Sequence, residues 1–75
     1  MNNTRRKQLK TWTNKANQLK DELDSILLDE QDYYDNIPEN LQGSQRASDS
    51  EEAMAKIEEA MDIIDEAIEV IDEIV

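Results

Sequence analysis

Large apolar residues recur every three or four positions along the first half of the chain. The series runs Leu9, Trp12, Ala16, Leu19, Leu23, Ile26 and Tyr33. Steps that alternate between three and four place side chains on one face of an α-helix. Glu30 is the polar residue that interrupts the series, while Leu27 and Tyr34 widen the stripe. No proline or glycine breaks this stretch, so the pattern predicts a first helix over residues 4–35.

A repeat of seven residues runs through the last third of the chain. Glu-Glu-Ala-Met begins at Glu51 and again at Glu58, and Asp65 opens a third copy that reads Asp-Glu-Ala-Ile. A heptad repeat sets one face of a helix against a partner helix. Ser48 and Glu51 have the spacing of a capping box, in which each residue caps a free backbone N–H at a helix start. We therefore expect a second helix over residues 50–74.

The residues that disfavour helix are concentrated between these two segments, in a connection over residues 36–49. Pro38 disfavours helical backbone at the residue before it, and Gly43 is free to adopt positive φ. A short turn here would bring Ile37 and Leu41 over the end of the core as apolar plugs. A flexible loop is the alternative reading of this stretch.

The charge distribution indicates how the two helices pair. Residues 1–20 contain six basic residues and no acid, whereas residues 21–75 contain two basic residues and nineteen acids. The cations therefore lie near the positive end of the first helix dipole, and many acids lie near the negative end of the second. An antiparallel hairpin, with Asp35 opposite Ser50, brings these opposite charges together. The fold class predicted is all-α, an antiparallel two-helix hairpin.

The heptad positions predict which side chains fill the hairpin core. In this register Trp12 is expected to be buried near Ile71 and Ile74, and Leu19 to face Ala67. The predicted core residues are Trp12, Leu19, Leu23, Ile26, Tyr33, Ile57, Ile64 and Ile71.

The second helix carries more apolar surface than one partner helix can cover. The residues in excess are Met61, Ile68 and Val75 on one flank and Ile63 and Val70 on the other. Left exposed, they would form a patch of roughly several hundred Å², which soluble monomers rarely show. A twofold dimer covers such a patch with its own copy, so we expect two hairpins to form a four-helix bundle.

Composition argues against an enzyme and against a cofactor or metal site. The chain has no Cys and no His, so the commonest metal ligand and the commonest general base are missing. Carboxylates on exposed helix faces lack the cleft that acid–base catalysis requires. The acids in residues 29–32 lack the glycine and the alternating spacing of an EF-hand loop. The longest apolar run is Ile26–Leu28, so no membrane association is expected, and we expect a cytoplasmic location.

The net charge of −11 narrows the candidate functions. The first is a non-enzymatic protein–protein interaction or assembly module, whose unknown protein partner is expected to be basic. A nucleic-acid mimic that inhibits a DNA-binding protein is one alternative. The regular heptad favours a simpler reading, in which the acids form the solvated face of a coiled-coil-like helix. A small RNA-binding helical bundle is another. The RNA-binding bundle is disfavoured because the N-terminal cations do not share one helix face. Trp12 is also the only aromatic residue among these cations.

One segment resembles a known group of proteins. The sequence from Tyr34 to Ser44, which contains Pro-Glu-Asn-Leu-Gln, precedes Arg46 and the Glu-Glu-Ala heptads. This arrangement is similar to short acidic helical proteins encoded in bacterial and phage genomes, over residues 30–75. The resemblance implies a bacterial or phage source and brings no activity with it.

Overall fold

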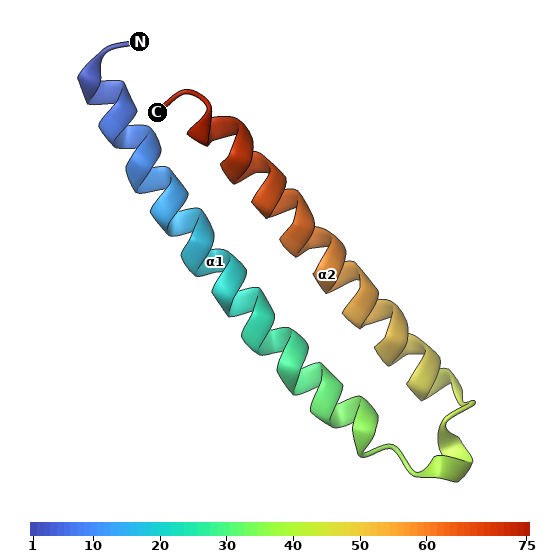
Figure 1. Ribbon diagram of the computed structural model, residues 1–75. Coiled ribbons are helices and arrows are strands. Elements are labelled where there is room, and N and C mark those ends of the chain that lie inside the picture. Colours follow the sequence, from blue (N-terminus) through green and yellow to red (C-terminus); the bar gives the residue numbers. More distant parts are fainter.

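The computed structural model describes residues 1–75 as two long helices that run antiparallel. Helix α1 spans Asn3–Asp35, a short 3-10 helix η1 spans Glu39–Leu41, and helix α2 spans Gln45–Asp72. The molecule measures 60 × 15 × 11 Å, and both termini lie at the end opposite the connection (Figure 1). The predicted all-α hairpin is therefore confirmed.

Helix α2 begins earlier than the sequence suggested. Its N-cap is Ser44, whose Oγ accepts a hydrogen bond from the backbone N–H of Ala47 at 3.3 Å. Ser48, the expected cap, lies inside the helix, and its N–H donates to the carbonyl of Ser44. The predicted start at residue 50 is wrong because nothing from Gln45 onward breaks a helix and Ser44 is an equally good cap. The helix also ends at Asp72, two residues before the predicted end.

The connection between the helices spans residues 36–44 and closes one end of the hairpin. Asn36 caps α1, with its Nδ2 donating to the carbonyl of Asp32 at 2.7 Å. Ile37 is 3% exposed and plugs the end of the core as predicted. The same prediction is wrong for Leu41, which is 42% exposed at the end of η1. A tight 3-10 turn leaves room for one plug between the helix ends.

The seam between the helices consists of residues that the fold covers at least in part, at alternating steps of three and four. On α1 the seam residues are Leu9, Thr13, Ala16, Lys20, Leu23, Leu27, Glu30 and Tyr34. On α2 they are Ala47, Ser50, Met54, Ile57, Met61, Ile64, Ile68 and Ile71. The most fully covered are small or β-branched: Ala16, Ala47, Ser50 and Ile68. The seam is therefore narrow, and much of the apolar surface lies outside it.

Half of the predicted hairpin core lies outside this seam. Leu23, Ile57, Ile64 and Ile71 are seam residues as expected. The prediction is wrong for Trp12, Leu19, Ile26 and Tyr33, which are 40–56% exposed. The apolar surface of α1 is three rows wide, and α2 covers two of them. The row that contains Lys20 and Tyr34 faces α2 in place of the row that contains Trp12.

Two hydrogen bonds between the helices hold α1 in this rotation. Lys20 Nζ donates to Asp65 Oδ1 at 2.6 Å, and Tyr34 Oη donates to Glu51 Oε1 at 2.5 Å. Neither bond would form if the Trp12 row faced α2, because Lys20 and Tyr34 would then turn away from it. The pairs also confirm the predicted register, in which Asp35 lies opposite Ser50.

A candidate interaction face

Most of the large exposed apolar residues of the two helices lie on one side of the hairpin, which we call the apolar face; Leu28, 60% exposed, lies outside it. Its residues are Trp12, Leu19, Ile26 and Tyr33 on α1, and Ile63 and Val70 on α2, with Ala53, Ala60 and Ala67 between the two rows. The α1 members are spaced seven residues apart, so they lie along one stripe of the helix. Both helices thus contribute large apolar side chains to the same surface.

Two adjoining hollows flank Trp12 on this face. One, of about 310 Å³, lies between Trp12, Leu19 and Ala67, with Lys15, Ala16 and Ile64 around them. The other, of about 460 Å³, lies between Trp12, Ile63 and Val70, with Glu66, Ala67 and Ile71 around them. Ala67 is common to both hollows, and its small side chain leaves the space that opens beside the indole. The face is therefore grooved and able to receive side chains from another surface.

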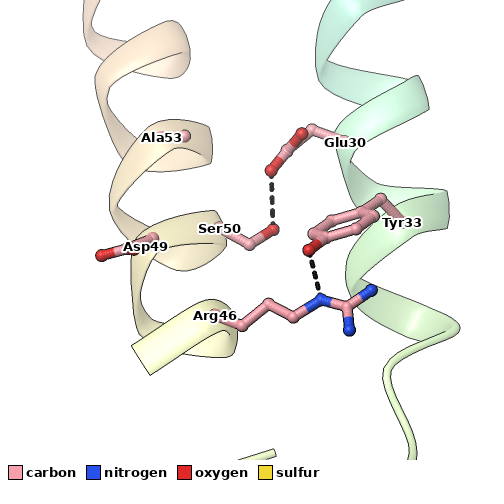
Figure 2. A pocket seen from close by; sticks show the side chains of 6 residues that line it. All are labelled: Glu30, Tyr33, Arg46, Asp49, Ser50 and Ala53. Carbon is pink, nitrogen blue, oxygen red and sulfur yellow. Dashed lines mark hydrogen bonds between the residues drawn. The ribbon is translucent and has the colours of Figure 1, made fainter. Parts of the chain in front are cut away.

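Polar contacts mark the end of the apolar face nearest the connection (Figure 2). The Arg46 guanidinium lies 5.2 Å from the centre of the Tyr33 ring, and its Nε donates to the Tyr33 hydroxyl at 2.5 Å. Ser50 Oγ donates to Glu30 Oε1 at 2.9 Å (Figure 2). The open hollow of about 440 Å³ among these residues is also lined by Asp49 and Ala53.

The one aliphatic hydroxyl at this end of the face, that of Ser50, is not accessible. The Ser50 hydroxyl is directed at the Glu30 carboxylate, but Ser50 is only 2% exposed. Its hydrogen bond joins the two helices inside the seam. The contact therefore serves to satisfy a polar pair within the hairpin.

The opposite side of the hairpin carries two interhelical polar contacts, Lys20–Asp65 and Tyr34–Glu51. There the hydrogen bond to Asp65 raises the pKa of Lys20 above the ordinary lysine value. In the same way, the hydrogen bond to Glu51 raises the pKa of Tyr34 above the ordinary tyrosine value. The two broad sides of the molecule thus differ: the Lys20–Asp65 and Tyr34–Glu51 bonds lie on one side, and most of the exposed large apolar side chains lie on the other.

The predicted self-association residues divide between the seam and the surface. Ile63, Val70 and Val75 are 40–58% exposed, as that role requires. The prediction is wrong for Met61 and Ile68, because both pack in the seam against α1, where Ile68 is 8% exposed.

Sequence reasoning also missed that the α1 stripe belongs to the exposed face. The signal was present in Leu27 and Tyr34, which add a third apolar row to α1. A helix with three apolar rows needs two partners when one partner covers only two rows. The excess of apolar surface that the sequence predicts for the second helix is therefore present on the first helix as well.

Charge divides the hairpin along its length. The open-end half, residues 1–20 and 62–75, contains six basic and six acidic residues, so its formal charge is zero. The loop half, residues 21–61, contains two basic and thirteen acidic residues, so it carries the whole net charge of −11. The apolar face crosses both halves.

No group of three or more His, Cys, Asp or Glu side chains is arranged to hold a metal ion. Neither helix has the length and apolar character needed to cross a membrane. Comparison of the chain with models of known protein families, with curated protein sequences and with solved structures finds no match in any of the three.

Proposed function

We propose that this chain is a non-enzymatic protein–protein interaction or assembly module that binds another helical surface through its apolar face. The observation that carries the proposal is the exposed, seven-spaced stripe from Trp12 to Tyr33, next to the hollows beside Ala67. Stripes of this spacing are how one helix packs against another.

The size of the apolar face supports an interaction role. Trp12, Leu19, Ile26, Tyr33, Ile63 and Val70 are each 40–58% exposed. At about 100 Å² each, they leave roughly 600 Å² of apolar surface uncovered, which is at the upper end for the largest patch on a monomer. A partner that removes this surface from water gains the hydrophobic free energy of burying it.

Nucleic acid is a poorer fit as a partner. The six N-terminal cations share the open-end half with six acids, so a phosphate backbone would meet no net positive charge there. The one tryptophan lies on the apolar face, where its neighbours are Leu19 and Ala67. It is therefore not part of a row of exposed aromatics on which bases could stack.

The test compares two variants of equal charge on neighbouring positions. Leu19→Glu with Ile26→Glu places two carboxylates on the apolar face. Gln18→Glu with Ser25→Glu places them on exposed positions outside it. Proteins retained on the tagged chain from its source cells are identified by mass spectrometry, purified and recombined with each variant. A differently tagged copy of the chain is included among them.

We expect at least one purified partner to lose binding, by tenfold or more, to the face variant while keeping it for the control. Equal binding of every partner to both variants would contradict the proposal. Circular dichroism establishes that both variants remain helical, which is expected because all four positions are exposed.

A further inference from the structure

We propose that the occupant of the apolar face is a second copy of this chain, turned end for end, so that α1 packs against α1 of the second copy. This inference rests on the proposed function and names its partner. The two hairpins form a four-helix bundle with their connections at opposite ends. Three features of the chain lead to this arrangement.

The first feature is the symmetry of the α1 stripe. Its four large residues are evenly spaced, so reversing one copy brings Trp12 against Tyr33 of the other and Leu19 against Ile26. Each contact occurs twice about a twofold axis, as a closed dimer requires. Tyr33 of the second copy then enters the hollows beside Trp12.

The second feature is charge. A bundle with both connections at the same end would place two loop halves of −11 side by side. Turning one copy end for end places each loop half against the neutral open-end half of its partner. Within α1 the match is closer, because residues 1–20 carry six cations and residues 21–35 carry seven acids. Charge complementarity thus selects the reversed orientation.

The third feature is area. The roughly 600 Å² of apolar surface on the face compares with about 800 Å² of total surface per partner in a standard stable interface, of which a little over half is apolar. The apolar face alone therefore supplies the apolar part of a stable dimer. Further apolar area from the connection is not required.

The reversed orientation also fixes which residues on the edge of the stripe meet. Lys15 and Asp29 lie in one row beside it, seven residues on either side of Glu22. Reversal brings Lys15 next to Asp29 of the second copy, and Glu22 next to Glu22 of the second copy on the axis. All three positions are exposed in the single hairpin, so they accept substitution.

The chain contains no cysteine, which makes site-specific crosslinking direct. The single variants are Glu22→Cys, Lys15→Cys, Asp29→Cys, Glu66→Cys and Ser25→Cys, each treated with a short bis-maleimide. Glu22→Cys should crosslink to itself. Lys15→Cys should crosslink to Asp29→Cys when the two chains are mixed. Ser25→Cys, exposed on α1 outside the face, is the matched control and should stay uncrosslinked.

A bundle with both connections at one end gives a different pattern. There α1 faces α2 of the second copy, so a mixture of Lys15→Cys and Glu66→Cys would crosslink and Glu22→Cys would not. That result overturns the orientation. Monomer mass by light scattering, with no crosslink in any variant, overturns the second copy as occupant. The proposed function then depends on whether another purified partner still distinguishes the face variant from its control.

Discussion

Lys20 and Asp65 join the two helices through a hydrogen-bonded ion pair, with 2.6 Å between Nζ and Oδ1. A lysine in a mainly apolar seam is unfavourable when the sequence is considered alone. The structure shows that its head group reaches the edge of α2, where Asp65 accepts the bond, while its aliphatic stem covers the seam. This pair helps to determine which row of α1 remains exposed.

The stability of the hairpin is expected to fall in alkali because of this pair and the Tyr34–Glu51 hydrogen bond. Hydrogen bonds raise the pKa of Lys20 and of Tyr34 in the folded state. A raised pKa means that the folded chain holds the proton more tightly, so the stabilisation is complete below the unfolded pKa, near pH 10, and is lost as pH rises through the folded pKa. Melting scans at about pH 9 and pH 11 should show a lower midpoint at the higher pH.

The double variant Lys20→Met with Tyr34→Phe isolates these two groups. It should show a smaller fall in melting temperature across the same range. Lys56→Met is the control, because Lys56 pairs only with Glu59 on its own helix, at 3.6 Å. A fall in the double variant as large as that of the control would contradict the account.

The start of α2 can be tested by two serine substitutions. Ser44→Ala removes the side chain that caps the Ala47 N–H and should lower the free energy of unfolding by about 1 kcal/mol. Ser48→Ala lies inside the helix and should be neutral or slightly stabilising, because alanine has the higher helix propensity. Urea unfolding followed by circular dichroism measures both. A larger loss for Ser48→Ala would place the helix start where the sequence first suggested.

Ile37 is the one almost completely buried side chain of the connection. Ile37→Ala should cost about 2–5 kcal/mol, and the milder Ile37→Val about 0.5–1.5 kcal/mol, because the side chain is almost completely buried. Leu41→Ala should cost less than Ile37→Ala, since Leu41 is 42% exposed. The same unfolding assay ranks the three variants, and an equal loss at Leu41 and Ile37 would contradict the structure.

Trp12 is the only tryptophan, so fluorescence reports directly on the apolar face. In the single hairpin its side chain is 43% exposed, and association should cover it. The emission maximum should move to shorter wavelength as the chain is concentrated from below to above its dissociation constant. Leu19→Glu with Ile26→Glu should abolish the shift, whereas Gln18→Glu with Ser25→Glu should keep it. An emission maximum independent of concentration that already indicates exposure would argue that the face stays uncovered.

The sequence predicted the helices, their antiparallel pairing and the register between them. These follow from local periodicity and from the placement of charge, which act over many residues. The rotation of α1 about its own axis could not be obtained in this way. Trp12 and Thr13 are adjacent in the sequence but belong to different apolar rows of α1, and either row can face α2. The choice depends on individual partners, such as Asp65 for Lys20 and Glu51 for Tyr34.

The same limit explains why the sequence predicted only part of the apolar face. The sequence predicts Ile63 and Val70 on this face because α2 has more apolar surface than one seam can bury. Both residues are exposed. The heptad pattern predicts Met61 and Ile68 at the surface because it places the alanines in the seam. In the structure the larger residues take the seam, and Ala60 and Ala67 lie at its edge. Apolar rows that differ by one heptad position are difficult to separate by pattern alone.

Sedimentation equilibrium of the unmodified chain tests the central claim most directly, because it measures whether the apolar face is covered in solution by a second copy. At tens of micromolar the account predicts twice the chain mass of 8.7 kDa. The same mass is expected for Gln18→Glu with Ser25→Glu, and the single-chain mass for Leu19→Glu with Ile26→Glu. A single-chain mass for the unmodified protein throughout this concentration range would contradict it.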